Sequence, residues 1–230
     1  MRKTLRALAH LLDYPSETLK AHIAEVRKAI EGEACLSAGN IAHLEPLLQK
    51  FERAPLLDLQ MRYSALFDNS RALSLHFFEH IHGENAERGQ AMINLGEEYI
   101  ERGYLMTRDE LPDFIPMFLE FISCLPVDEA RDWLSQPAHV FAVLKQRLDE
   151  RESEYAGLFH LLLCLADEKP DPQAIRELLA RGQESENASV DDSWEEEPVT
   201  FMAAHHNKPV SSIVAKLKAA GKLIMTSRDN

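Results

Sequence analysis

The stretch L111-P-D-F-I-P-M-F-L-E-F-I-S-C-L125 decides the fold class of this chain. Its large apolar residues recur at steps of three and four, which is the spacing of one face of an α-helix. They are Leu111, Phe114, Ile115, Phe118, Phe121, Ile122 and Leu125. We therefore expect an amphipathic helix from Leu111 onward, preceded by a capping box at Thr107-Arg108-Asp109-Glu110.

The helical spacing continues on the C-terminal side of this stretch. Two further stripes follow, the first opening after Pro137: Val140, Leu144 and Leu148, then Tyr155, Leu158, Phe159, Leu162 and Ala166. No stretch alternates apolar and polar residues as a strand would. Prolines and glycines divide the chain into roughly eight to ten helices. We expect an all-α fold, a single compact multi-helix bundle.

Composition and charge limit the possible partners. The chain has 230 residues, 45% of them apolar, which is enough for one buried core and a tail. Its formal charge of −13 argues against a nucleic acid or an anionic membrane as main partner, because both require clustered lysines and arginines. Basic peptides fit better. Neither a membrane-length apolar run nor a signal peptide is visible, so we expect a cytoplasmic protein with no direct membrane insertion.

The sequence changes character near residue 181. We expect a helical domain over residues 1–181 and an acidic, flexible tail over residues 182–230. Residues 182–197 contain seven acidic side chains and no basic one, so this segment is not expected to fold alone. Farther on, Val210, Ile213, Val214 and Leu217 lie among lysines and would fit a short amphipathic helix. The tail is either mobile or a pseudo-ligand that covers the binding surface.

The stretch from Tyr63 to Met92 places an unusually dense polar set within an apolar stripe. A core-facing helix needs far fewer ionisable groups than this stretch carries, so it predicts a binding surface. The polar residues are Arg71, His76, Glu79, His80, His82, Glu84 and Arg88.

One part of this set spells a zinc-protease pattern. His76-Phe77-Phe78-Glu79-His80 reads H-x-x-E-H, in which two histidines on one helix face bind zinc and the glutamate acts as general base. A hydrolytic zinc site also needs a third protein ligand, and no acidic residue is singled out for that role. No glycine-rich phosphate loop or G-x-S-x-G turn occurs either. Zinc hydrolysis is the least favoured hypothesis, and we expect no catalytic or metal site.

Several motifs in order resemble one family. They are Leu12-Asp13-Tyr14-Pro15, Tyr63-x-x-Leu66-Phe67-Asp68, Phe78-Glu79-His80-Ile81-His82-Gly83-Glu84, Arg88-Gly89-Gln90-Ala91-Met92, Glu110-Leu111-Pro112-Asp113 with Pro116, and Trp194-Glu195-Glu196-Glu197. Together they resemble the NarJ-type family, the delta subunit or molybdenum-cofactor assembly chaperone of respiratory nitrate reductase. The chain departs from that pattern at Phe114, where relatives often carry histidine, and at His76.

The resemblance implies an all-helical chaperone and not an enzyme. Its client would be the apo catalytic (alpha) subunit of nitrate reductase, possibly within an alpha–beta complex, recognised through the client's N-terminal segment before membrane anchoring. The client would receive molybdopterin guanine dinucleotide and an iron–sulfur cluster, while the chaperone keeps no permanent cofactor. A helical adaptor or a stable oxidoreductase subunit is the alternative, and it would require a large persistent apolar interface.

The mechanism that we expect is recognition of a client helix in a groove. Exposed aromatics between the Tyr63–Met92 region and the Leu111–Leu125 helix would bury the client's apolar face. Carboxylates at the rim would pair with its basic residues, and Arg71 and Arg88 would be internal partners of those carboxylates. Neighbouring glutamates would raise the pKa of His80 and His82. The expected client-binding residues are Tyr63, Phe67, Arg71, Glu79, His80, His82, Glu84, Arg88, Asp113 and Glu120.

Overall fold

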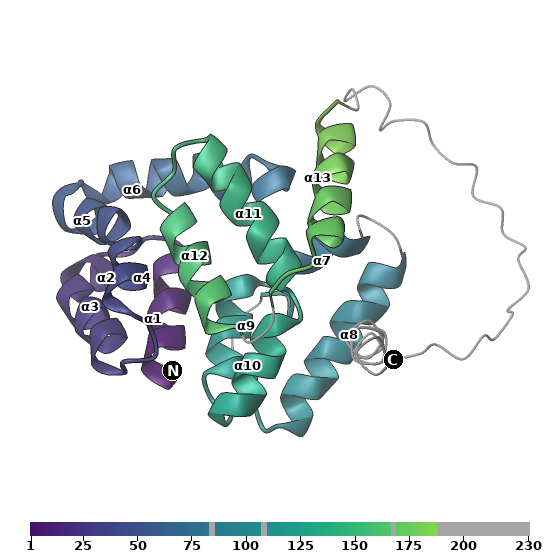
Figure 1. Cartoon of the computed structure of the whole chain (residues 1–230), viewed down its shortest axis with the longest axis horizontal. Helices are drawn as coiled ribbons and strands as arrows, with labels where there is room; N and C mark the ends of the chain where they lie inside the picture. Colours follow the sequence, from purple (N-terminus) through teal and green to yellow (C-terminus); the bar gives the residue numbers. More distant parts are fainter. Residues whose placement is uncertain (83–85, 107–109, 167–168, 188–230) are drawn as a thin grey trace, which may run out of the picture.

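The computed structural model describes residues 1–82, 86–106, 110–166 and 169–187, and Figure 1 shows their arrangement. Over these residues the chain is a set of helices without a strand, and the isolated antiparallel bridge between His76 and Phe114 is its sole β-type pairing. The predicted all-α class is confirmed. Glu84, the first three residues of the expected capping box (107–109) and the tail beyond residue 187 lie outside the described residues.

The first six helices form one end of the molecule (Figure 1). Ser16 and Ser37 begin the second and fourth of them, and their hydroxyl oxygens accept the backbone N–H groups of Leu19 and Asn40. The turn at His22 divides what would otherwise be one helix, which accounts for one of the helices beyond the expected number in the described residues. The bounds are α1 Arg2–Leu12, α2 Glu17–Ala21, α3 Ile23–Gly32, α4 Ala38–Ala42, α5 Glu45–Arg53 and α6 Leu56–Tyr63.

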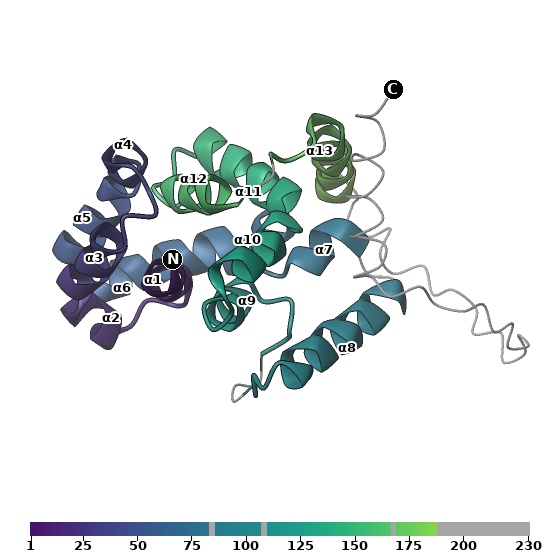
Figure 2. The same ribbon diagram turned by 60° about the horizontal axis from the view of Figure 1, so that its bottom comes forward.

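The middle of the chain crosses to the opposite end. It runs through the π-helix η1 Ser64–Asp68, the 3₁₀-helix η2 Arg71–Leu73, α7 Phe77–His82 and α8 Ala86–Glu101. Figure 2 shows α8 at the periphery, on the far side of the molecule from α2–α5. Among the helices, α7 makes the most extensive backbone contact with α8. This peripheral helix and its neighbours hold the site described below.

The stretch that decides the fold begins its helix later than predicted. Helix α9 starts only at Ile115, because Pro112 disfavours helical backbone at the preceding residue, Leu111. Pro116 is tolerated in the first turn of α9, where a backbone N–H would have no partner within the helix. The remaining helices are α9 Ile115–Ile122, α10 Val127–Ser135, α11 Ala138–Glu150, α12 Ala156–Leu165 and α13 Pro172–Asn187. Helix α13 runs across the predicted boundary at residue 181.

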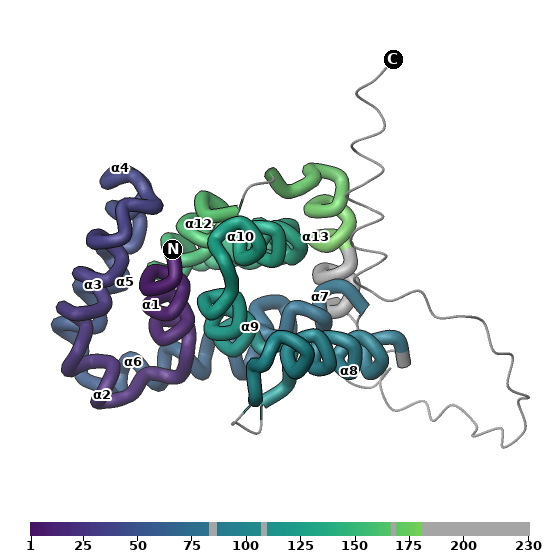
Figure 3. Tube along the Cα trace, turned by 90° about the horizontal axis from the view of Figure 1, so that it is seen from below, coloured from purple at the N-terminus to yellow at the C-terminus, as the bar shows by residue number. Residues whose placement is uncertain are grey.

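The core lies where α9 packs along α1 and where α11 packs against α12. Figure 3 shows α9 and α10 between the N-terminal helices and α8. The largest fully buried side chains of the described residues are aromatic: Phe51, Tyr99, Phe118, Phe121, Phe141 and Phe159. Arg147 of α11 is also buried, and it donates to the carbonyl oxygens of Ala72, at 2.7 Å, and Leu178, at 3.4 Å. This arginine thereby fixes η2 and α13 on α11.

The carboxylate of Glu33 caps the first turn of α1 from a distant position. It accepts the N–H groups of Lys3 and Thr4 at 2.9 and 2.8 Å. Burial raises the pKa of Glu33, but these bonds and that of the Met1 α-amino group outweigh burial and lower the pKa to about 2. The stabilisation is therefore present above the ordinary pKa near 4.5 and is lost as pH falls toward 2.

We expect Glu33→Gln to lower the free energy of unfolding by about 1–2 kcal/mol at pH 7, because the amide is a weaker acceptor for these N–H groups. Urea unfolding at pH 7 and pH 3 measures the effect, which should shrink at the lower pH. Glu31→Gln is the matched control, because Glu31 is an exposed residue in the last turn of α3, two positions before Glu33. Equal effects of the two substitutions would contradict the capping role.

Candidate functional site

Asp113 organises the junction between α7 and α9. Its side chain is fully buried, and its Oδ2 accepts the N–H of Phe78 at 3.2 Å while its backbone oxygen accepts the N–H of Phe77 at 3.1 Å. Both N–H groups belong to the first turn of α7, where a helix has unpaired donors and favours a negative charge. The loop before α9 therefore holds the start of α7.

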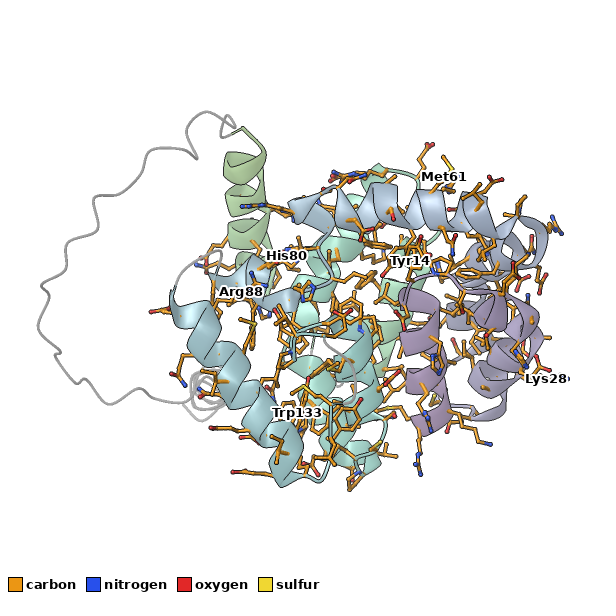
Figure 4. The ribbon with its side chains drawn as sticks, turned by 180° about the vertical axis from the view of Figure 1, so that it is seen from behind. Tyr14, Lys28, Met61, His80, Arg88 and Trp133 are labelled. Carbon is orange, nitrogen blue, oxygen red and sulfur yellow. The ribbon has the colours of Figure 1, made fainter. Side chains whose placement is uncertain are left out.

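Arg88 of α8 joins this junction. Its Nη2 lies 2.9 Å from Glu79 Oε1 and 3.9 Å from Asp113 Oδ2, and His76 Nδ1 lies 3.2 Å from Asp113 Oδ1. We call these four residues, His76, Glu79, Arg88 and Asp113, the polar cluster. Figure 4 shows Arg88 and His80 where α7 and α8 meet. Arg88 is thus an internal partner of the carboxylates, as expected, and the cluster holds one end of α8.

The histidines of this region differ in their electrostatic surroundings. Burial opposes protonation of His76, but the hydrogen bond to Asp113 and its charge outweigh burial and raise the pKa of His76. Burial lowers the pKa of His80, whose Nε2 lies 2.9 Å from the carbonyl oxygen of Ser74. The expected upward shift at His80 is therefore wrong, because desolvation exceeds the influence of Glu79. His82 Nδ1 lies 3.8 Å from Glu87 Oε2, and its ring contacts Phe78.

The H-x-x-E-H pattern does not form a two-histidine helix face. His76 precedes α7 and faces Asp113, whereas His80 faces the carbonyl oxygen of Ser74. Within the described part of the chain, no group of three or more His, Cys, Asp or Glu residues is placed to hold a metal ion. The zinc hypothesis therefore has no site in these residues.

The expected exposed aromatics lie in the core instead. Tyr63 and Phe67 are 4% and 7% exposed, and both rings contact Tyr155 of the segment before α12. The Tyr63 hydroxyl donates to the carbonyl oxygen of Leu12 at 3.1 Å. Tyr63 thereby joins the end of α6 to the end of α1, and Phe67 packs on Tyr63 and Tyr155. The expectation that these two residues are exposed is wrong.

Two other predicted site residues stand apart from the polar cluster. Arg71 is exposed on η2, which packs against α11. Glu120 of α9 is half-buried, and its Oε2 accepts the hydroxyl of Tyr104 at 3.3 Å. The nine predicted residues that the structure describes therefore do not form one surface.

An apolar cavity of about 30 Å³ lies beside the polar cluster, where α7, α8, α9 and α10 meet. We call it the α7–α10 cavity. Its lining residues are Phe77, Phe78, Ile81, Ala91, Asn94, Leu95, Phe118, Trp133, Gln136 and Pro137. It lies between the two segments from which the client groove was expected, yet none of the nine predicted residues that the structure describes lines it. The wall from α10 was missed entirely, although the i, i+4 pair Ala91 and Leu95 signals the inward face of α8.

A second arginine holds the other end of α8. Arg102 forms ion pairs with Glu98 of α8 and with Glu129 of α10, and its Nε lies 3.0 Å from Glu129 Oε1. The guanidinium of Arg102 also lies 5.2 Å from the ring centre of Trp133. Figure 4 shows Trp133 farther along α8 from Arg88. The cavity is thus flanked by an arginine cluster at each end. Because the cavity has room for only about two water-sized probes, a larger side chain would enter only if one of the surrounding helices moved.

No helix in the described ranges is both long and apolar enough to cross a membrane.

Comparison with known proteins places these features in a family. The model for the nitrate reductase delta subunit matches residues 33–160, which include the polar cluster and the whole α7–α10 cavity. The nitrate reductase molybdenum cofactor assembly chaperone NarJ of Escherichia coli K12 is 40% identical, over 85% of this chain and 84% of its own length. A probable chaperone of the same description, NarW of that strain, is 34% identical over 86% of this chain and 83% of its own.

More distant relatives agree. The probable NarJ of Bacillus subtilis is 31% identical, over 70% of this chain and 86% of its own length. The crystal structure of a putative redox enzyme maturation protein from Archaeoglobus fulgidus superposes with a TM-score of 0.50 at 23% identity, covering 70% of this chain and 91% of that one. That likeness shows a shared fold. The chain belongs to the nitrate reductase delta subunit family.

Proposed function

We propose that this protein is a system-specific assembly chaperone of respiratory nitrate reductase. It holds the catalytic subunit in the cytoplasm while the molybdenum cofactor is inserted, and it catalyses no reaction itself. The names of its relatives as molybdenum cofactor assembly chaperones support this role. The observation that carries the proposal is the apolar α7–α10 cavity, which lies under a helix held by ion pairs at its two ends.

The client is the apo alpha subunit, alone or within an alpha–beta complex, and its N-terminal segment is the part that is bound. An apolar side chain of that segment enters between α8 and α10 and contacts Phe78, Ile81 and Trp133. Outward movement of α8 exposes this wall, and apolar burial compensates for the loosened ion pairs. The excess of carboxylates in the chain favours basic residues around the client's apolar anchor.

The chaperone acts on the cofactors only through the client. While the segment is bound, the alpha subunit stays open to receive molybdopterin guanine dinucleotide and an iron–sulfur cluster. Release lets α8 return, and the completed subunit goes on to the membrane. The polar cluster serves this cycle as the anchor about which α8 moves, since Arg88 joins it to Glu79 and Asp113.

The test is calorimetric titration of the full chain with a peptide of the N-terminal residues of the nitrate reductase alpha subunit. Asn94→Trp places a large side chain into the cavity from α8, and we expect at least about tenfold weaker binding, or about 1.4 kcal/mol. Ile93→Trp is the control, because Ile93 is exposed on the outer face of the same helix. Its affinity should stay within about twofold. Equal losses would place binding on the outer face of α8, and no binding to the unsubstituted chain would contradict the proposed client.

A further inference from the structure

The last part of the sequence has the chemistry of a ligand for the α7–α10 cavity. Residues 209–223, P-V-S-S-I-V-A-K-L-K-A-A-G-K-L, lie outside the described residues, so only their sequence is considered. Val210, Ile213, Val214 and Leu217 would share one face of a helix, and lysines lie among and around them. A basic amphipathic segment of this kind is the class of peptide for which the client site is proposed.

The last described helix contacts a helix that lines the cavity. Helix α13 packs against α11 and contacts α7, and α7 supplies Phe77, Phe78 and Ile81 to the cavity wall. Residues 188–208 connect α13 to the basic segment, and they can span up to roughly 70 Å when extended. A domain of this size has a radius of gyration of roughly 16 Å. The connection is therefore long enough for the segment to reach any side of the cavity.

Charge favours the same placement. Helix α8 carries four glutamates and one arginine, and α10 carries three acidic residues and one arginine. Glu97, Glu101 and Asp132 are exposed on these two helices. A segment lying between α8 and α10 would bring Lys216 and Lys218 near this acidic surface.

We propose that residues 209–223 bind the α7–α10 cavity of their own chain, with Ile213 and Leu217 as apolar anchors, and that the client must displace them. The part of the inference that concerns displacement rests on the proposed function, whereas the occupancy does not. An internal occupant covers Phe78 and Trp133 until a client with higher affinity arrives, and it keeps the apolar wall from binding unrelated chains.

Hydrogen exchange of the full chain, followed by mass spectrometry, tests the occupancy. We expect the amides of residues 209–223 to exchange at least about tenfold more slowly than in the free peptide, and Ile213→Asp with Leu217→Asp to abolish that protection. Ser212→Asp with Ala215→Asp adds the same charge to the opposite helix face and should leave the protection in place. Absence of protection, equal loss in both double variants, or protection that depends on protein concentration would each overturn the proposal.

Competition is read out in the same variants by titration with the alpha-subunit peptide. If the segment occupies the cavity about nine-tenths of the time, its removal by Ile213→Asp with Leu217→Asp makes the client bind about tenfold more tightly. Unchanged client affinity despite lost protection would overturn the displacement. If the alpha-subunit peptide binds neither the unsubstituted chain nor any variant while residues 209–223 remain protected from exchange, the result counts against the proposed function. The occupancy of the cavity by residues 209–223 would still stand.

Discussion

Gly157→Ala should lower the free energy of unfolding by about 3 kcal/mol or more, because an added methyl group has no space there. A Cβ at position 157 would lie 1.9 Å from the carbonyl oxygen of His43 and 2.7 Å from its carbon. Both are backbone atoms, so no side-chain rotation relieves the clash. Helix α12 would have to move away from the segment that follows α4, and α12 is also the main partner of α11 in the core.

Thermal unfolding measures this effect, and a loss of about 3 kcal/mol corresponds to a fall in Tm of roughly 6–12 °C for a chain of this length. Gly89→Ala is the matched control, because nothing lies within 4 Å of the added methyl group and alanine favours the interior of α8. That variant should be equally or slightly more stable than the unsubstituted protein. A Gly157→Ala protein of normal stability would show that α12 and the His43 backbone lie farther apart than described.

The fold class could be predicted because helical spacing is a local property of the sequence. Ile115, Phe118, Phe121 and Ile122 recur at helical steps, and all four are buried in α9. The start of α9 could not be predicted in the same way. Leu111 continues the stripe, yet it is 43% exposed, since Pro112 and the engagement of Asp113 with α7 keep the helix from starting before Ile115.

The location of the cavity was also within reach of the sequence, but its residues were not. An apolar stripe has the same pattern whether it faces a core or a ligand, so Tyr63 and Phe67 could not be told apart from Phe78 and Ile81. Contributions from distant segments have no local signal at all. Trp133 reaches the cavity from α10 only because α9 and α10 turn back beside α8.

Asp113→Ala should be the other strongly destabilising substitution, with a loss of about 3–5 kcal/mol, because it removes the carboxylate from a buried charged cluster. The Phe78 N–H would lose its acceptor, and Arg88 and His76 would lose a negative charge within 3.9 and 3.2 Å. Urea unfolding at pH 7 measures the loss. Asp132→Ala, on the exposed face of α10, is the control and should change the stability by less than about 0.5 kcal/mol.

Asp113→Asn separates the charge of this residue from its shape, since the amide oxygen still accepts the Phe78 N–H. The raised pKa of His76 means that its pairing with Asp113 stabilises the fold below the ordinary histidine pKa near 6.5, and that this stabilisation is lost as pH rises through the folded value. The asparagine variant should therefore lose more stability at pH 6 than at pH 8, relative to the unsubstituted protein. Equal losses at the two pH values would mean that the His76 charge does not contribute.

Asp113 holds the start of α7 and one end of α8, so weaker client binding by its variants would reflect a displaced cavity wall. Asn94→Trp is therefore the sharper probe of the cavity itself, because Asn94 lines the cavity and Asp113 does not.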